Sequence, residues 1–318
     1  MTLYSAQSPE KVLNLAHIIN PVVVPESSDL FVAQPITFQT MKNAQTHAKG
    51  KVNVTLYSAQ YPEDESIIPD GFVKTPNLET SVLDVGKFLV PRKLPLIKDI
   101  LDRLYEASPN ADYLIYTNVD IALQPHFYTE VTKFIEQGYD SFVINRRAIS
   151  DSYKSVADIP LMYAEKGQGH PGHDCFVFKR SLYPKFNLGL LCIGAVWVGR
   201  CFYVNCLLNS DKFAEFKDLY LTFHIGYESR WRNSKLNDYR FHNFQEMSKI
   251  IRKYKENQQP PYDPFFEETL AFIDKREKVE LKLAAKREKD QKWYNRFIRK
   301  LKGLVKDWVS TLLKNRNG

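Results

Sequence analysis

A carboxylate that follows a predicted strand is the strongest chemical signal in this sequence. Residues 113–116 are strand formers in one unbroken run, which predicts a strand covered on both faces. Asn118 and Asp120 come directly after it. Ligands bind at the carboxyl ends of strands in open α/β sheets, and one or two carboxylates with substrate phosphates can hold Mg²⁺ or Mn²⁺. The pattern therefore predicts a metal and phosphate site, with a plain turn after a buried strand as the alternative.

Two later motifs place histidines and a second carboxylate beside predicted strands. His173 and Asp174 lead into the apolar run 175–178, and His224 follows the run 219–223. A neutral imidazole at a strand end is a suitable metal ligand or diphosphate contact. Each of these residues also has a structural explanation, because a lone histidine is often satisfied within a fold and short aspartates favour caps and turns.

Two arginines could supply phosphate contacts. Arg146 and Arg147 follow the predicted strand 141–145 and begin a polar, glycine-containing segment, 146–172, which we expect to be a flexible loop over a site. A guanidinium can bind a phosphate through two parallel hydrogen bonds. Solvation at the surface is the other explanation for at least one of the two.

The elements that must position these residues alternate between strands and helices. Helical periodicity marks 96–104, and Pro125 and Gly138 bound a second helix. This alternation predicts an α/β fold in which helices flank a layered sheet. Residues 62–95 are expected to form a long irregular connection. The expected strands are 30–33, 52–56, 113–116, 141–145, 175–178 and 219–223, and further helices are expected at 34–47 and 197–208.

Composition and cysteine use favour an intracellular globular protein. The 318 residues are enough for a substantial core. The first 20 residues lack the pattern of a secretory signal, and residues 188–208 contain Arg200, Asn205 and three glycines, which disfavours a membrane span. The four cysteines show no Cys-x-x-Cys spacing and lie in apolar surroundings. We therefore expect buried free thiols, a reducing compartment and a cytoplasmic location.

The net charge of +7 is confined to the C-terminal end. Residues 292–318 contain eight basic residues and one acid, so the preceding residues balance to zero. A nucleic-acid-binding surface would need basic residues on the folded body, so no nucleic-acid partner is expected. Apolar residues recur in this segment at three- and four-residue steps, which predicts a basic amphipathic helix. Such a helix can lie on an anionic membrane and make the protein peripheral on its inner face, with docking on another helix as the alternative.

The chain is expected to have three parts. Residues 1–257 form a catalytic domain, 258–290 contain a Pro-rich boundary and a charged helix, and 291–318 form the basic amphipathic helix. The Gln-Gln-Pro-Pro run is the clearest boundary, and Asp263 and Pro264 are suited to cap and start the helix that follows.

The motifs around Asn118 and Asp120, around Asp174, and at His224 occur in an order that resembles GT-A glycosyltransferases. In that family a metal-binding Asp-x-Asp ends a central strand, an acidic residue follows a later loop, and a histidine near the end of the fold often completes the metal site. The resemblance covers roughly residues 30–243. It implies an α/β fold with a GT-A-like, Rossmann-type mixed sheet flanked by helices, here with a C-terminal helical extension. It also implies a nucleotide-sugar donor, a divalent cation on its diphosphate, and a glycan or lipid-linked acceptor.

The resemblance also implies roles for single residues. Asp120 and His224 would hold the Mn²⁺ or Mg²⁺ ion that stabilises charge on the departing diphosphate. Asp174, or Glu228 as second choice, would accept the proton of the acceptor hydroxyl if the reaction inverts. Asn118 departs from the pattern, because it stands where the first Asp is common and carries no charge. The expected contacts to the nucleotide donor are Asn118, Arg146, Arg147 and His173.

The preferred function is therefore a metal-assisted glycosyltransferase. A nucleotidyltransferase acting on sugar phosphates would use similar strand-end carboxylates, but residues 30–47 lack the glycine-rich phosphate loop that is usual there. A non-catalytic GT-A-like domain, held by its basic tail to a membrane or an acidic partner, is a further alternative.

Overall fold

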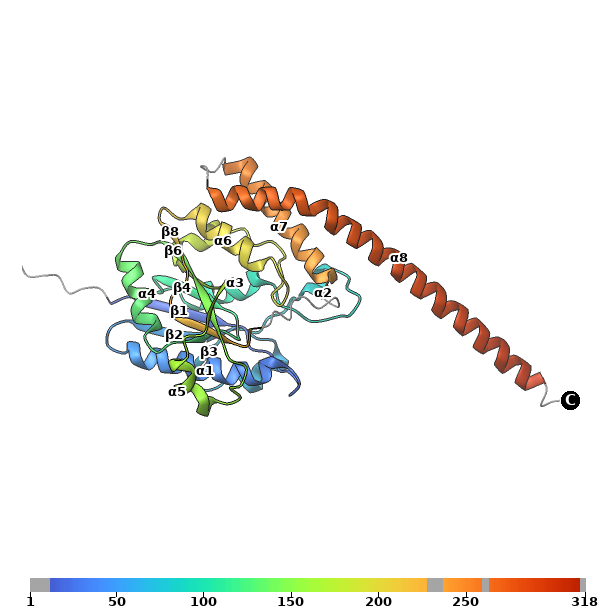
Figure 1. Cartoon of the computed structure of the whole chain (residues 1–318), viewed down its shortest axis with the longest axis horizontal. Coiled ribbons are helices and arrows are strands. Elements are labelled where there is room, and N and C mark those ends of the chain that lie inside the picture. Colours follow the sequence, from blue (N-terminus) through green and yellow to red (C-terminus); the bar gives the residue numbers. More distant parts are fainter. Residues whose placement is uncertain (1–11, 228–236, 259–262, 315–318) are drawn as a thin grey trace, which may run out of the picture. The chain divides into compact units, whose positions relative to one another are not determined.

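The computed structural model describes residues 12–227, 237–258 and 263–314. The chain divides into two compact units, Met1–Pro260 and Pro261–Gly318. Figure 1 shows the first unit as a central sheet with helices around it. This unit contains every strand of the described chain.

The first unit is built on one mixed sheet of nine strands. The strands are β1 (Asn14–Ile19), β2 (Asn53–Ser58), β3 (Phe72–Lys74), β4 (Tyr113–Thr117), β5 (Ala122–Leu123), β6 (Ser141–Ile149), β7 (Gln168–Lys179), β8 (Phe213–Phe216) and β9 (Thr222–Ile225). β3, β2, β1 and β4 are parallel neighbours, and β7 lies antiparallel between β4 and β6. β8 and β9 pair parallel with β6, and the short β5 pairs antiparallel with β9. This mixed sheet confirms the α/β fold class expected from the sequence.

Helices cover both faces of the sheet. Those of the first unit are α1 (Asp29–Ala48), α2 (Val82–Val85), α3 (Ile97–Ala107), α4 (Phe127–Glu136), α5 (Ile159–Ala164), α6 (Val198–Asn209) and α7 (Asn237–Gln258). α1 and α5 lie below the sheet in Figure 1, and α6 lies above it. The main core includes Phe38 of α1, Phe127 of α4 and Phe142 of β6, all buried. Toward α6, Phe202 stacks on Phe176 of β7 with ring centroids 4.1 Å apart.

The first strand and the first helix differ from the expectation. The sequence predicts a strand at 30–33, but these residues lie in the first turns of α1. Ser28 caps that helix, because its hydroxyl accepts a hydrogen bond from the Leu30 amide, and Asp29 adds a favourable charge to the first turn. The first strand is instead β1, which pairs with β2 on one side and β4 on the other. The fold therefore begins well before residue 30.

The two strands of the β6–β7 hairpin are longer than the sequence predicts. A loop is expected at 146–172, but β6 continues to Ile149 and β7 begins at Gln168. Register shifts interrupt the pairing of the two strands on either side of Asn145. Bulges of this kind bend a strand and re-aim its side chains, so polar residues can continue it. The two arginines expected to follow the strand therefore lie within β6.

All four cysteines are buried free thiols, as the sequence predicts. Cys175 lies on β7 in the main core, and Cys201 and Cys206 lie on α6. Burial raises the pKa of the Cys192 thiol to about 12, and it raises the pKa of the other three thiols as well. Thiols in such surroundings are inert, so these residues serve packing.

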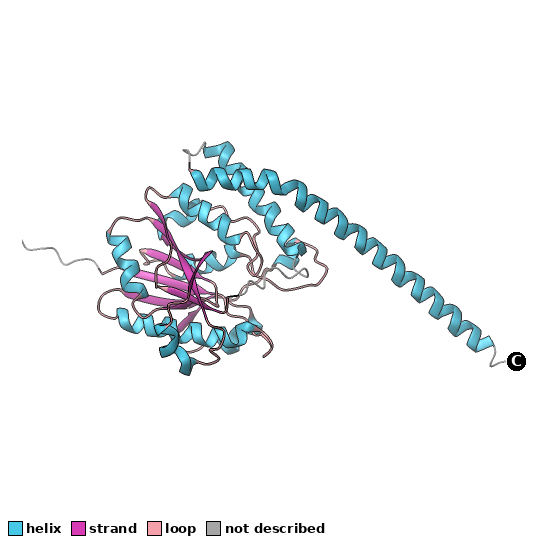
Figure 2. Cartoon of the chain, viewed as in Figure 1, coloured by secondary structure: helices cyan, strands magenta, loops and turns pink. Residues whose placement is uncertain are grey.

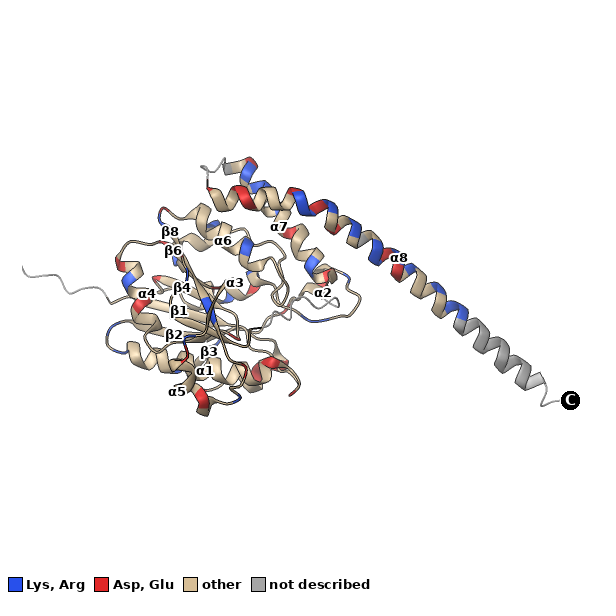
Figure 3. Cartoon of the chain, viewed as in Figure 1, with Lys and Arg blue, Asp and Glu red and all other residues tan. Residues whose placement is uncertain are grey.

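The second unit, in its described part, is the helix α8 (Pro264–Lys314) with its cap. The amides of Phe265 and Phe266 donate to the Asp263 carboxylate over 2.9 and 3.1 Å, which confirms the predicted cap. One continuous helix runs through both the charged and the basic segments (Figure 2). Figure 3 shows acidic and basic residues interspersed along its first part. Within the described ranges, no helix is both long and apolar enough to cross a membrane.

Candidate functional site

Asp120 and His224 form the candidate metal-binding pair. Asp120 lies in the turn between β4 and β5, and His224 lies on β9, the partner of β5. Asp120 Oδ2 is 3.3 Å from His224 Nε2, and both side chains are partly buried. His224 Nδ1 donates a hydrogen bond to the Gly226 carbonyl over 3.1 Å. A neutral ring then has its proton on Nδ1, and the lone pair of Nε2 faces the Asp120 carboxylate. Two such electron-rich atoms repel each other unless a proton or a cation lies between them.

The pair fits a divalent cation. With metal–ligand bonds of about 2.1 Å, ligand atoms 3.3 Å apart subtend roughly 100° at the metal, between octahedral and tetrahedral geometry. A carboxylate and an imidazole suit Mn²⁺, and Mg²⁺ would accept the carboxylate with substrate phosphates. Among the described residues, no group of three or more His, Cys, Asp or Glu side chains could hold a metal ion. A cation at this pair would therefore need ligands beyond these two side chains.

The surroundings of Asp120 keep its carboxylate ionised. Burial, the largest single effect, would raise the pKa of this group. The hydrogen bond and charge of His224, together with the charge of Arg146, outweigh burial and lower the pKa of Asp120 below its ordinary value of 3.8. The carboxylate is therefore an anion at neutral pH, which is the form that binds a metal.

Asn118 ties the end of β4 to β7. Its Nδ2 donates to Asp174 Oδ1 over 3.0 Å, and its Oδ1 accepts a hydrogen bond from the Tyr116 hydroxyl over 2.9 Å. Its backbone amide also donates to the Asp174 carbonyl over 3.3 Å. The residue that stands in place of the first Asp of the family pattern thus orients Asp174, and its side-chain oxygen is already engaged.

Arg146 holds the other oxygen of Asp174. Its Nη1 forms an ion pair with Asp174 Oδ2, and the two side chains are only 14% and 13% exposed. Arg146 Nε is buried and has no hydrogen-bond partner among the described residues. Buried N–H groups normally find an acceptor, so this unpaired donor is unusual. Because the charge of Arg146 also acts on Asp120, the ion pair and the candidate metal pair belong to one site.

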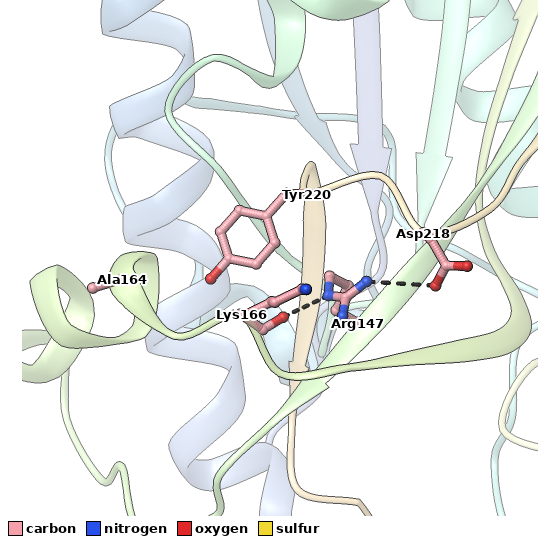
Figure 4. Close-up of a pocket in the computed structure, with 5 residues that line it drawn as sticks. All are labelled: Arg147, Ala164, Lys166, Asp218 and Tyr220. Carbon is pink, nitrogen blue, oxygen red and sulfur yellow. Dashed lines mark hydrogen bonds and ion pairs between the residues drawn. The ribbon is translucent and has the colours of Figure 1, made fainter.

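Arg147 serves a different part of the structure. Successive side chains of a strand point to opposite faces, and Figure 4 shows Arg147 among the residues of a separate cavity. Its Nη2 donates to the Gly167 carbonyl over 2.9 Å, its Nε donates to the Lys166 carbonyl, and its Nη1 is 3.4 Å from Asp218 Oδ1. The structure brings Arg146 to the site and ties Arg147 into the β6–β7 hairpin. The cavity, of about 340 Å³, is lined by Arg147, Ala164, Lys166, Asp218 and Tyr220.

His173 contacts β8 and α6. Its Nε2 is 3.2 Å from Glu215 Oε1, and its ring packs on Tyr203 with ring centroids 4.8 Å apart. Glu215 also accepts a hydrogen bond from Asn145 Nδ2 over 3.0 Å. Burial lowers the pKa of His173 below 6.5, against the raising effect of Glu215. The structure therefore gives His173 and its neighbour Asp174 different partners, although the sequence grouped them in one motif.

Sequence reasoning missed one residue of this site, His170. It lies on β7, and the charges of Arg146, Asp174 and His224 all act on it. The available signal was the Gly-His-Pro-Gly run, which interrupts the strand pattern and therefore predicts a loop. Glu228, the second choice for a general base, lies outside the described residues.

Comparison with known proteins finds similarity only at the level of structure. No family model and no curated protein matches the sequence. The chain matches GalNAc-T7, crystallised with UDP, GalNAc and Mn²⁺, with a TM-score of 0.50 and 12% identity over 83% of this chain and 57% of that one. It matches S. aureus TarS 1–349 in complex with UDP with a TM-score of 0.49 and 8% identity, over 83% and 71% of the two chains. A putative glucose-1-phosphate thymidylyltransferase from Bacillus anthracis matches with a TM-score of 0.39 and 7% identity, over 80% and 99%.

The fold is similar to that of GalNAc-T7. The match to GalNAc-T7 confirms the GT-A-like architecture that the sequence motifs imply. At this level of identity the likeness shows the fold alone, and one fold supports many activities. Any functional conclusion must therefore rest on the residues of the site.

Proposed function

We propose that this protein is a metal-assisted glycosyltransferase that moves a sugar from a nucleotide-diphosphate donor to a glycan or lipid-linked acceptor. The observation that carries the proposal is the convergence of Asp120, His224, Arg146 and Asp174 in one site. The fold supports it, because ligands of such sheets bind at the carboxyl ends of strands. GalNAc-T7 shares the fold and was crystallised with UDP, GalNAc and Mn²⁺, which are ligands of the classes that suit these residues.

Three side chains would help to stabilise the negative charge of the diphosphate. Asp120 Oδ2 and His224 Nε2 would hold Mn²⁺ or Mg²⁺, which when bound supplies a Lewis acid for the negative charge of the departing diphosphate. Arg146 would approach the same charge from β6, because its Nε–H has no described protein acceptor and can donate to a phosphate oxygen.

Asp174 is the proposed general base of an inverting transfer. Asn118 holds its Oδ1, so the direction of Oδ2 is set before any substrate binds. Oδ2 is paired with Arg146 and must leave that partner to accept the proton of the acceptor hydroxyl. Phosphate oxygens of the donor would compete for the same guanidinium. Donor binding would thus free Asp174 for the acceptor, and Glu228 stays the second choice for this role.

The C-terminal helix is proposed to hold the enzyme on an anionic membrane surface at the inner, cytoplasmic face. Trp293, Tyr294 and Phe297 of α8 are exposed, and the rings of Trp293 and Phe297 stack 5.4 Å apart. Aromatic residues favour the headgroup region, where each nearby Lys or Arg adds about 1 kcal/mol of attraction to anionic lipid. A lipid-linked acceptor would lie at the same surface.

Ligand-induced thermal stabilisation tests the proposed function. The purified protein would be heated with a panel of nucleoside diphosphates and nucleotide sugars, with and without Mn²⁺. A ligand at a hundred times its Kd adds about 2.7 kcal/mol to the free energy of unfolding, so a specific donor gives a clear shift. We expect a metal-dependent shift with one nucleotide base, and its absence in Asp120→Ala. The absence of a shift with every nucleotide would favour a non-catalytic domain.

A further inference from the structure

His170 is held in a defined orientation beside the candidate site. Its Nδ1 accepts a hydrogen bond from the Gly172 amide over 2.9 Å. An imidazole nitrogen that accepts an N–H has no proton of its own, so the neutral ring carries its proton on Nε2. Among the described residues, this Nε2–H has no hydrogen-bond acceptor. The ring therefore presents a donor of fixed direction that the fold does not use.

Gly172 brings this ring close to Asp174. A Cβ atom on Gly172 would lie 2.7 Å from Asp174 Oδ2 and 2.7 Å from His170 Nδ1. The carboxylate and the imidazole thus flank one backbone position that only a glycine can occupy without displacing them. The same Oδ2 pairs with Arg146, so the imidazole and the guanidinium both lie near one carboxylate.

The charges around His170 identify the ligand that its Nε2–H suits. Burial lowers the pKa of this ring, and the charges of Arg146 and His224 lower it further, against the opposite effect of Asp174. Arg146 adds a second donor without a described acceptor, its buried Nε–H. Donors that lack acceptors and stand beside a candidate metal pair are suited to a polyanion, because hydrogen bonds to a charged oxygen are the strong ones.

We propose that His170 is a positioning residue for the diphosphate of the donor, with its Nε2–H donating to a phosphate oxygen beside Arg146. The inference rests on the proposed function and adds to it a residue that the family pattern does not supply. The competing explanation is purely structural: the ring would serve only to accept the Gly172 amide and so hold the backbone of β7. The two roles use different nitrogen atoms, so they can be separated by substitution.

Two matched variants separate the roles. His170→Asn keeps an oxygen near the position of Nδ1, which can accept the Gly172 amide, but removes the distal donor. His170→Gln places an N–H₂ near the position of Nε2 and gives up the proximal acceptor. Binding of inorganic pyrophosphate with Mg²⁺, measured by calorimetry on the full chain, avoids any choice of nucleotide base. We expect His170→Asn to weaken this binding roughly tenfold to a hundredfold, as loss of a hydrogen bond to a charged group does, and His170→Gln to retain most of it.

The outcomes distinguish this inference from the proposed function. If the wild-type protein binds pyrophosphate and His170→Asn binds it equally well, the role of His170 is refuted while the proposed function stands. If the wild-type protein binds neither pyrophosphate nor any nucleotide, both are refuted. A measurement on the wild-type chain avoids effects on folding: in protein with ¹⁵N-labelled histidine, pyrophosphate should shift the Nε2 resonance of His170 more than its Nδ1 resonance. Equal or absent shifts would contradict the proposal.

Discussion

Acid should destabilise this protein through one buried histidine. His17 lies on β1 with no exposed surface, its Nδ1 2.8 Å from the Tyr128 hydroxyl and its Nε2 2.9 Å from Thr117 Oγ1. Burial lowers its pKa from 6.5 to about 3. The unfolded chain therefore takes up a proton at this residue as the pH falls through 6.5, whereas the folded protein does so only near pH 3.

The size of the effect follows from these two pKa values. Above pH 6.5 the neutral ring is present in both states and stability does not depend on its titration. As the pH falls below 6.5, His17 becomes protonated in the unfolded state but stays neutral in the folded state, and the free energy of unfolding drops. The loss is about 2 kcal/mol at pH 5 and approaches about 5 kcal/mol well below pH 3, where it levels off. This is a large part of the roughly 5–15 kcal/mol that stabilises a typical domain.

Urea unfolding at pH 7.5 and pH 5 measures this loss. His17→Gln keeps polar atoms near Tyr128 and Thr117 but cannot titrate, and carboxylates contribute equally to both proteins. The drop in unfolding free energy between the two pH values should be about 2 kcal/mol larger in the wild type than in the variant. His47→Gln, at an exposed histidine, is the matched control and should behave as the wild type. Equal pH dependence of wild type and His17→Gln would refute the reasoning.

The remaining predictions concern the site and the tail. Asp120→Ala should lower sugar transfer at least a hundredfold with the fold intact, and transfer retained with Mn²⁺ present would remove this residue from the metal site. Asp174→Asn should lower kcat far more than it weakens donor binding, whereas equal losses would make Asp174 a binding residue. Asn118→Asp should lower the melting temperature by roughly 2–4 °C, about 1 kcal/mol, because it sets a second carboxylate against Asp174 where an amide now donates over 3.0 Å. An unchanged melting temperature would argue against this orienting role. Deleting residues 292–318 should release the protein from vesicles of anionic lipid without unfolding it, and unchanged co-sedimentation would exclude the membrane contact.

The strand ends of the site could be predicted because they depend on local features. Asp120 and His224 each follow an apolar run in the sequence, and this pattern is visible within a few residues. The directions of Arg146 and Arg147 could not be predicted in the same way. They depend on how far β6 extends and where it bulges, which its pairing with β7 and β9 decides.

Two other differences between the sequence prediction and the structure also arise from contacts that are distant in the sequence. Residues 30–33 are apolar and suit a strand by composition, but the cap at Ser28 and packing of the following helix override that preference. His170 stands in a glycine- and proline-containing run that is typical of loops. Only the three-dimensional pairing of β7 with its neighbours places this histidine near Arg146 and Asp174.

The contact between Asp120 and His224 lies beside the shortest strand pairing of the sheet, that of β5 with β9. β5 contributes two residues, Ala122 and Leu123, to its pairing with β9. So short a pairing opens locally more easily than the longer ladders of the sheet, such as β6–β7. A cation bound by both side chains would stabilise the pairing of β5 with β9, because the two strands could not separate without breaking a metal–ligand bond. Slower amide hydrogen exchange in β9 would then report occupancy of the metal site without any substrate.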